Sequence, residues 1–371
     1  MATSRSTITE GHTTVLVAAP KTPNTSKRGP GTRTSEPFYN PAMEQSRDLS
    51  ILVTQWYIDT KKRPLRICDG LAASGIRGLR FANELTGEFH VTINDSKTSA
   101  VELIQENIDR NNLKNATASR CDLNVLLSSE RFQAIDIDPF GSPIMFLDSA
   151  MRSITPGGLL SVTATDTAPL CGVFPDVCHR RYAAWPQHGS SMHEVGLRIL
   201  LGVLAREAGK YDKGITPLLT YATDHYFRLY VKVDSGKKLA NASMDNVCSI
   251  PTSSIPLSPD SDKLVGPLWI GKVLQAKVLA EVRTRLSSTS LGSRPQLWKL
   301  LSVLEDEAEA PPFFYTAEDI ASLLKRSMPP LDHLLDALRR EGCFASRTHF
   351  TPTGFKTDAS WDVVQQCLAR L

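Results

Sequence analysis

Segments with the pattern of buried strands alternate with segments of helical periodicity, and this order restricts the fold more than any other feature. The predicted strands are residues 64–69, 90–95, 116–122, 132–138 and 158–165, and the predicted helices are residues 48–60, 76–85, 99–111 and 191–209. Alternation of this kind is typical of βαβ units, so it predicts an α/β fold with a doubly wound, mostly parallel sheet. Residues 218–223 and 226–233 flank a tight turn and predict a closing antiparallel hairpin.

The composition changes along the chain and predicts four regions. The chain has 371 residues, which is enough for about two domains. Residues 1–36 are rich in Thr, Ser, Pro and Gly and carry five basic residues against two acidic ones, which predicts a basic arm with one short strand. The α/β domain then spans residues 37–233, and residues 234–263 form a Ser/Pro-rich insertion or linker. Residues 264–371 form a smaller C-terminal α+β domain.

The end of the chain has its own pattern from about residue 316. Two helices joined by a turn are followed by two short strands, the order typical of a winged-helix module. Basic residues gather near the end of its second helix and on the predicted wing, namely Arg339, Arg340, Arg347 and Lys356. A second basic segment, from Lys272 to Lys299, has six basic residues and one acid. Taken alone, each fits a solvated basic surface, and with an RNA partner each would be a phosphate-contacting surface.

Composition excludes several classes of protein. The longest apolar runs, such as residues 199–204, are much shorter than the roughly 18 residues of a bilayer span, and no signal-peptide core is present at the N-terminus. Seven cysteines without a CxxC pair predict reduced thiols and a cytoplasmic protein. The formal charge of +3 neither requires nor excludes a polyanionic partner.

A group of Cys and His residues does not have the spacing of a metal site. The group comprises Cys171, Cys178, His179, His188 and His193. Their separations match no standard zinc pattern, so no metal is predicted.

The turn after the first strand is rich in small residues. It runs from Asp69 to Gly78 with the sequence DGLAASGIRG. Small residues let the backbone approach a ligand closely, and the start of the next helix offers N–H groups to an anionic group. The turn is not GxGxxG, and taken alone it fits a simple packing turn equally well.

Two further acids end later strands and add to this signal. Asp95 ends the second strand, 26 residues after Asp69 (95 − 69), where a carboxylate can accept both ribose hydroxyls of a nucleoside. Asp122 ends the third strand, where it could accept an adenine amino group. Ligands of open α/β sheets bind beyond the carboxyl ends of the strands, so these acids face one crevice. An acidic crevice suits a nucleoside with a sulfonium cation and no phosphates, which is S-adenosylmethionine.

The end of the fourth strand carries a second site, Asp136-Ile137-Asp138-Pro139-Phe140-Gly141. The lone pair of an aromatic exocyclic amine is delocalised into the ring, so a methyltransferase must accept hydrogen bonds from that amine and align it with the methyl group. Asp138 and a neighbouring carbonyl offer the acceptors, and Phe140 offers a ring on which a base can stack.

Several motifs in a fixed order carry a resemblance over nearly the whole chain. They are TITEG near residue 8, FYNP from Phe38, SRD around Arg47, DGLAASGIRG, DIDPFGSP, THF near residue 349 and GFKTDA near residue 355. The chain resembles the tRNA guanine-26 N2-dimethyltransferase family. The resemblance implies a class I methyltransferase domain, a family-specific C-terminal domain, and transfer of one or two methyl groups from S-adenosylmethionine to the guanine amine of tRNA. It implies no protein partner.

The resemblance also implies roles for individual residues. Asp138 would receive the proton or hydrogen bond of the amine, and the flipped guanine would lie between Phe38 and Phe140. The cofactor residues would be Arg47 and Arg77 at or near the methionine carboxylate, Asp95 on the ribose, and Asp122 with the backbone of Leu123 on the adenine, together with Asp69 of the glycine-rich turn. Many members carry zinc-ribbon cysteine pairs where this chain has only Cys248 in its 234–263 segment.

Two other functions fit parts of the pattern. One is an exocyclic-amine methyltransferase acting on DNA adenine or on a protein glutamine amide, against which the Phe38 motif and the winged-helix tail argue. The other is an inactive RNA-binding module, against which the presence of Asp138, Asp95 and Asp122 together argues.

Overall fold

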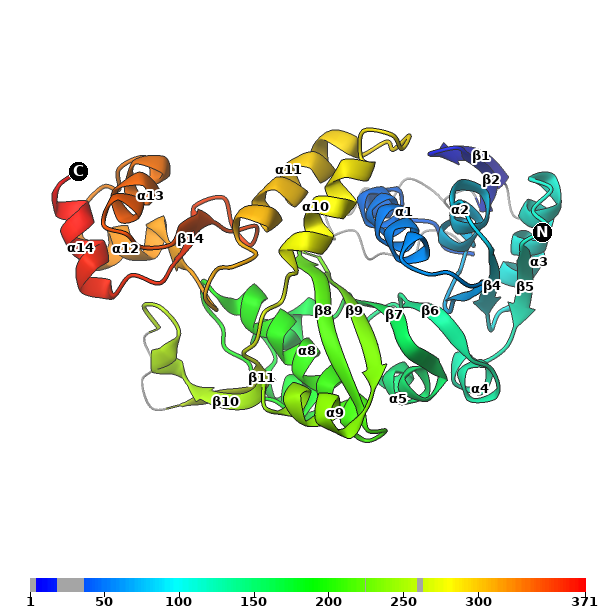
Figure 1. The fold of residues 1–371 in the computed structure, drawn as a ribbon, viewed down its shortest axis with the longest axis horizontal. Helices are drawn as coiled ribbons and strands as arrows, with labels where there is room; N and C mark the ends of the chain where they lie inside the picture. Colours follow the sequence, from blue (N-terminus) through cyan, green and yellow to red (C-terminus); the bar gives the residue numbers. More distant parts are fainter. Residues whose placement is uncertain (1–4, 19–36, 224, 259–262) are drawn as a thin grey trace.

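The computed structural model describes residues 5–18, 37–223, 225–258 and 263–371 (Figure 1). Its largest unit is a seven-stranded sheet with the strand order β5-β4-β3-β6-β7-β9-β8. The strands are β3 (Leu65–Asp69), β4 (Phe89–Asp95), β5 (Ala116–Arg120), β6 (Phe132–Ile137), β7 (Ile154–Ala164), β8 (Lys213–Ala222) and β9 (Phe227–Ser235). The first five pair in parallel, and β9 pairs antiparallel with β7 and β8. The predicted doubly wound sheet and its closing hairpin are therefore confirmed.

Helices cover both faces of this sheet. They are α1 (Glu44–Asp59), α2 (Ile76–Glu84), α3 (Thr98–Arg110), α4 (Leu123–Ser129), α5 (Ile144–Ser153), α6 (Thr167–Leu170), α7 (Pro175–Tyr182) and α8 (Met192–Gly209), with a 3-10 turn η1 (Pro41–Met43) before α1. In Figure 1, α1 and α2 lie on one side of the strands, and α4, α5 and α8 on the other. The apolar residues of α8 are almost all buried, because this helix packs against β8 and β11 in the middle of the molecule.

In the sheet domain, the sequence patterns missed the helices α4, α5, α6 and α7 and the start of one strand. α4 is a single short helix directly after Asp122, whose carboxylate accepts the backbone N–H groups of Asn124 and Val125 and so caps it. α5 follows the DIDPFGSP motif, which was interpreted only for its chemistry. β7 begins at Ile154, four residues before the predicted strand.

The N-terminal segment forms a hairpin instead of a single strand. β1 (Arg5–Glu10) and β2 (Thr13–Ala18) pair antiparallel, and the rest of the predicted basic arm lies outside the described residues. The hairpin packs on α2 and α3. Its Leu16 exchanges two hydrogen bonds with Asn107, at 2.7 and 2.9 Å, which fixes its position against α3.

The segment between the sheet and the C-terminal module contains regular structure as well as the predicted insertion or linker. Its elements are α9 (Lys237–Met244), β10 (Val247–Pro251), η2 (Thr252–Ser254), β11 (Leu264–Trp269), α10 (Ala276–Arg285) and α11 (Arg294–Asp306). α9 packs on the edge strand β8, while β10 and β11 form a two-stranded antiparallel sheet. α10 and α11 pack against α1, so both reach back onto the domain that contains the seven-stranded sheet.

The C-terminal module has the predicted order of helix, helix, strand and strand. Its elements are β12 (Tyr315–Thr316), α12 (Ala317–Leu324), α13 (Leu331–Arg340), β13 (Ala345–Arg347), β14 (Gly354–Thr357) and α14 (Trp361–Ala369). The three strands form one sheet in the order β12-β14-β13. α13 buries Leu334, Leu335 and Leu338, which belong to a small core separate from the main one.

Lys356 does not lie on an exposed wing, and the prediction that it contacts RNA phosphate is wrong. Its side chain is 3% exposed, and its ammonium group lies 2.8 Å from Glu194 of α8, which is fully buried. Arg198 pairs with the same carboxylate at 2.8 Å, and the backbone N–H of Phe313 donates to it. We call Glu194, Arg198 and Lys356 the junction cluster, because it joins the C-terminal module to the sheet domain.

Among the described residues, no helix is both long and apolar enough to span a bilayer. Within the same residues, no three His, Cys, Asp or Glu side chains are placed to hold a metal ion. The group around Cys171 and Cys178 is dispersed: both thiols are buried, while the His179 ring stacks on Trp185 at 4.3 Å.

Candidate active site

A cavity of about 890 Å³ opens at the carboxyl ends of the parallel strands. Its walls come from the loops after β3, β4, β6 and β7, from residues 37–43 and from the tip of the β8–β9 hairpin. The predicted site residues that line it are Phe38, Arg47, Asp69, Arg77, Asp95, Asp138 and Phe140. Carboxyl ends of neighbouring parallel strands meet at one edge of a sheet, so residues far apart in sequence converge there.

Hydrogen bonds from backbone N–H groups to the carboxylates of Asp69 and Asp95 hold the glycine-rich turn in place. Asp69 accepts the backbone N–H of Gly78 at 2.8 Å, and a Cβ on Gly78 would lie 2.9 Å from that carboxylate oxygen, so this position requires glycine. Gly75 has φ +78°, a conformation that favours glycine, and it starts α2. Asp95 accepts the N–H of Ala73 through one oxygen, at 2.9 Å. The turn is thereby tied to the end of β4.

Asp69 is a buried carboxyl with an unusual environment. Burial and the neighbouring Asp136 carboxylate raise its pKa to about 7, while the Arg77 guanidinium partly opposes that rise. A raised pKa reflects an excess of negative charge in a poorly hydrated space. A cation placed in the cavity would relieve that excess.

Asp138 is held at the cavity wall by a buried ion network. Arg77 donates to its carboxylate, and Asp138 remains 22% exposed while Arg77 is 7% exposed. Arg77 also lies 3.6 Å from Asp136, which is paired with the fully buried Arg228. Ser50 of α1 accepts hydrogen bonds from both arginines, at 2.5 and 3.1 Å. We call Arg77, Arg228, Asp136 and Asp138 the cavity cluster.

Arg77 makes contacts that the resemblance did not imply. Its guanidinium contacts Asp138, Asp136 and Ser50 and so fixes the orientation of the Asp138 carboxylate. Asp136 and Arg228 were not recognised as partners from the sequence. Asp136 could have been suspected from its place in DIDPFG, but Arg228 lies in β9 without a motif of its own.

Phe38 and Phe140 lie against each other at the cavity mouth. Their ring centroids are 4.5 Å apart in an edge-to-face arrangement, and Phe140 is 49% exposed. A base stacked between two rings needs them about 7 Å apart, twice the contact distance of carbon atoms. The two predicted rings are thus brought together, and a base can enter between them only after they separate.

Arg47 is anchored by the N-terminal hairpin. It donates to Glu10 through two nitrogens, at 2.8 and 2.5 Å, and Tyr39 donates its hydroxyl to the same carboxylate at 2.7 Å. The two arginines Arg47 and Arg80 lower the pKa of Glu10 against the opposing effect of burial. Glu10 lies in the TITEG motif but was not predicted as a functional residue. It positions the segment that carries Phe38.

Asp122 and Leu123 do not line the cavity. Asp122 is exposed and caps α4, and Leu123 is buried directly beneath Gly70, where a Cβ would lie 2.9 Å from its methyl groups. Their predicted contact with adenine therefore has no counterpart in the cavity as it stands.

A further carboxylate lines the cavity and was not predicted. Asp166 follows β7 and is 9% exposed at its side chain. The buried Tyr182 donates its hydroxyl to one of its oxygens at 2.6 Å, and Arg181 donates to the other at 3.2 Å.

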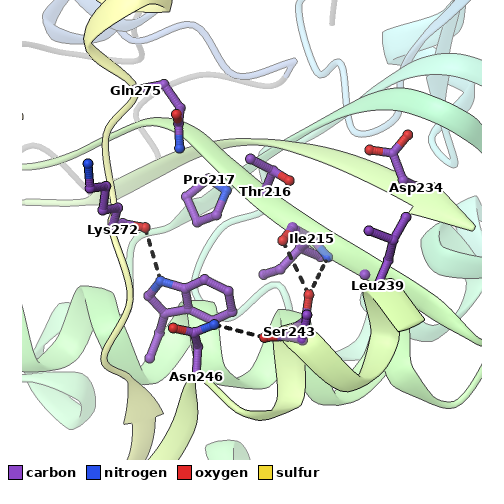
Figure 2. Close-up of a pocket in the computed structure, with 12 residues that line it drawn as sticks. Ile215, Thr216, Pro217, Asp234, Leu239, Ser243, Asn246, Lys272 and Gln275 are labelled. Atoms are coloured by element: carbon purple, nitrogen blue, oxygen red, sulfur yellow. Dashed lines mark hydrogen bonds between the residues drawn. The ribbon is translucent and has the colours of Figure 1, made fainter. Parts of the chain in front are cut away.

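A second, smaller pocket of about 240 Å³ lies beside β8 and α9 (Figure 2). Its wall includes Ser243, which accepts the backbone N–H of Ile215 at 2.9 Å and donates to its carbonyl at 3.3 Å. None of the residues predicted for methyl transfer lines it. The candidate chemistry therefore belongs to the larger cavity.

Comparison with known proteins agrees with this geometry. The family described as N2,N2-dimethylguanosine tRNA methyltransferase matches residues 17–369. The tRNA (guanine(26)-N(2))-dimethyltransferase of Methanobrevibacter smithii is 38% identical over 354 residues, covering 90% of this chain and 91% of that protein. The enzyme of the same name from Pyrococcus abyssi is 36% identical, covering 90% and 92%.

A solved structure is similar over almost the full length of both chains. It is the complex of Trm1 from Pyrococcus horikoshii with S-adenosyl-L-methionine, with a TM-score of 0.86 and 35% identity, covering 98% of this chain and 99% of that chain.

Proposed function

We infer the reaction from one premise: this chain belongs to the N2,N2-dimethylguanosine tRNA methyltransferase family. It has the class I S-adenosylmethionine-dependent methyltransferase fold followed by a C-terminal domain. The chain transfers one or two methyl groups from S-adenosylmethionine to the N2 amine of guanine-26 in tRNA. One observation supports this cavity as the site of the reaction: Arg77 holds the Asp138 carboxylate at the cavity wall.

Asp138 is the acceptor for the guanine amine in this proposal. A carboxylate that keeps one face open to the cavity can accept an amine hydrogen and orient the nitrogen lone pair toward the methyl donor. Arg77 holds that carboxylate from behind, so its position does not depend on the substrate. Pro139 and Phe140 follow directly in the cavity wall, where the Pro139 carbonyl offers a second acceptor.

The acidic half of the cavity fits the cofactor. S-adenosylmethionine supplies the methyl group and carries a sulfonium and an ammonium cation beside its carboxylate. Asp69 has a raised pKa, which a nearby cation would lower, and Asp95 lines the cavity at the end of β4. We assign Asp95 to the ribose and Asp69 to the amino-acid part. The adenine roles of Asp122 and Leu123 rest on the resemblance alone.

The two phenylalanine rings hold the base. Phe38 and Phe140 separate by about 2.5 Å or more when a flipped guanine enters, and their stacking on the base replaces the contact they make with each other. Bases that are modified within folded RNA have to leave their stack in the same way.

We assign residues 264–371 to binding the tRNA body, in keeping with the winged-helix order of the last module. Several basic residues of the 272–299 segment already pair with acids, namely Lys272 with Glu309, Arg283 with Glu305 and Arg285 with Asp59. Arg347 is 41% exposed and pairs with Asp332. Exposed pairs of this kind are weak and can exchange an acid for a phosphate. The proposed compartment is the cytoplasm, in keeping with seven free cysteines.

One experiment tests the proposed reaction. The purified chain is incubated with S-adenosylmethionine and an unmodified tRNA transcript carrying guanine at position 26, and the digested RNA is analysed by mass spectrometry. N2-methylguanosine and its dimethylated form should appear at that position, and a transcript with adenine there should remain unmodified. Methylation of duplex DNA or of a glutamine peptide in place of tRNA would reject the proposal.

A further inference from the structure

Asp166 is a cavity carboxylate that the proposed reaction leaves without a role. It lines the same cavity as Asp138 and Phe140, and it belongs to the loop after β7, the strand next to β6. Neighbouring parallel strands lie about 4.8 Å apart, so the loops that follow them share one side of the cavity. The Asp138 and Asp166 carboxylates therefore border the same space from adjacent strand ends.

The two loops are bonded to each other directly. Gly141 donates its N–H to the Thr165 hydroxyl at 2.6 Å, and Thr165 donates its own N–H to the Gly141 carbonyl at 3.0 Å. These reciprocal bonds fix Thr165, and with it Asp166, relative to the Asp138-Pro139-Phe140 turn. A base bound by that turn therefore has one fixed orientation relative to Asp166.

The Asp166 side chain is also fixed in orientation. Tyr182 donates to one oxygen at 2.6 Å and is itself anchored by the Ser142 hydroxyl at 2.8 Å, while Arg181 donates to the other oxygen. An ionised carboxylate has about four acceptor positions, so these two bonds leave acceptor capacity on both oxygens. Burial raises the pKa of Asp166, and the hydrogen bonds from Tyr182 and Arg181 oppose part of that rise. The result is a preorganised hydrogen-bond acceptor at the cavity wall.

We propose that Asp166 determines base specificity by accepting the N1–H of the flipped guanine while Asp138 accepts its N2 amine. This inference rests on the proposed function. Guanine presents two adjacent donors, N1–H and the N2 amine, whereas adenine presents a lone pair at N1. A fixed acceptor at N1 therefore binds guanine and repels a base with a lone pair there. Sites built around such a hydrogen bond reject analogues that lack it strongly, because the buried acceptor is left unpaired.

2-Aminopurine at position 26 separates this role from general support of the fold. It keeps the exocyclic 2-amine that is methylated, but its N1 carries a lone pair in place of the proton. The wild-type chain should methylate tRNA with 2-aminopurine at least about a hundredfold less efficiently in kcat/KM than tRNA with guanine. Asp166→Asn replaces one acceptor oxygen by an N–H donor that suits the lone pair. The variant should lose about tenfold to a hundredfold on guanine, and the ratio of the two substrates should shift at least about tenfold toward 2-aminopurine.

The outcomes are distinguishable. An equal loss on both substrates in a folded Asp166→Asn variant that still binds S-adenosylmethionine would show that Asp166 only braces α7, and would overturn the proposal. If the variant does not fold, the wild type decides alone: equal methylation of guanine and 2-aminopurine would equally overturn it. Asp176→Asn, an exposed acid on α7, is the matched control and should leave the ratio unchanged. Absence of methylation on guanine-26 by the wild type would reject the proposed function itself, a separate result.

Discussion

The cavity cluster and the junction cluster are built from the same chemistry but end in different surroundings. Both place guanidinium or ammonium groups against buried carboxylates. Asp138 keeps 22% of its side chain exposed to the cavity, whereas Glu194 is fully buried between Arg198 and Lys356. The first cluster therefore leaves an acceptor for a ligand, and the second is closed within the protein.

The contrast shows how to judge a buried ion pair. A sealed pair contributes to the fold only, and its removal leaves an unpaired buried charge. A pair with one carboxylate edge on a cavity also orients that edge for binding or proton transfer. The types of charged group are the same in a sealed pair and in a pair at the cavity. The two differ in whether a carboxylate is exposed to the cavity.

The largest effect should follow from removing the open carboxylate. Asp138→Ala should reduce turnover by about 10² to 10⁴, because the amine loses its acceptor, while S-adenosylmethionine affinity changes little. Turnover is measured by methyl incorporation into tRNA and affinity by calorimetry. Asp148→Ala, an exposed acid paired with Arg152, is the control and should behave as wild type. Loss of cofactor binding in Asp138→Ala would place the residue at the cofactor instead.

Opening the sealed cluster should change stability instead of chemistry. Lys356→Met removes the ammonium group and leaves Glu194 with Arg198 alone, which should lower the free energy of unfolding by about 3 kcal/mol. Denaturant titration measures the change, and kcat of the folded variant should stay within about threefold. Arg370→Met breaks an exposed pair with Glu341 and should cost less than about 1 kcal/mol. Unchanged stability together with lost tRNA affinity would mean that Lys356 faces RNA after all.

The same cluster predicts a pH dependence. Lys356 and Arg198 lower the pKa of Glu194 to about 2, against the opposing effect of burial, from its ordinary value of 4.5. Because the folded pKa lies below the unfolded one, this stabilisation is complete above pH 4.5 and is lost as the pH falls toward 2. The difference in unfolding free energy between wild type and Glu194→Gln should therefore shrink by about 3 kcal/mol over that interval. A difference that is the same at pH 6 and pH 3 would contradict the pairing.

A smaller effect is expected from a comparison of two acids of the sheet domain, Asp95 and Asp122. Asp95→Ala should weaken cofactor binding about tenfold, because a carboxylate that faces the cavity is lost. Asp122→Ala should change it by less than about threefold, since Asp122 lies outside the cavity, but should destabilise the fold by about 1 kcal/mol through loss of the α4 cap. Calorimetric titration with S-adenosylmethionine measures both variants. An equal loss of S-adenosylmethionine affinity in both variants would show that Asp122 contacts the cofactor.

The smallest effect concerns the exposed edge of the C-terminal module. Arg347→Ala should reduce the slope of log affinity for tRNA against log salt concentration by a little under one unit, if its guanidinium exchanges Asp332 for a phosphate. Filter binding at several salt concentrations gives the slope. Arg339→Ala, on the same module, is the comparison variant. A slope unchanged in both would move the tRNA contact to other basic residues.

The sheet could be predicted from the spacing of apolar residues along the chain. The convergence of carboxylates could be predicted from the parallel order of the strands. Strand patterns at β3, β4 and β6 identified the ends at which Asp69, Asp95 and Asp138 lie, and the parallel order brings such ends together. Asp122 belonged to the same pattern but became a helix cap, since its carboxylate accepts two backbone N–H groups of α4. Local capping and strand-end geometry cannot be told apart from one sequence.

Partners across long separations could not be predicted. Arg228 lies 92 residues after Asp136, and Lys356 lies 162 residues after Glu194. A basic residue on a short strand looks the same in sequence whether it faces solvent or a buried acid. The sequence therefore led to the wrong assignment of Lys356 to RNA. Asp166 directly follows the predicted strand 158–165, so the strand-end argument that identified Asp95 could have identified it as well.

The hairpin of β1 and β2 has a consequence for how the chain matures on the ribosome. Synthesis delivers Glu10 and Leu16 first, but their partners Arg47 and Asn107 emerge much later. The segment made first is thus held in place by a helix that is made much later, and the same hairpin carries Glu10, which anchors Tyr39 beside Phe38. The hairpin therefore reaches its final position against α3 only after Asn107 has been synthesised.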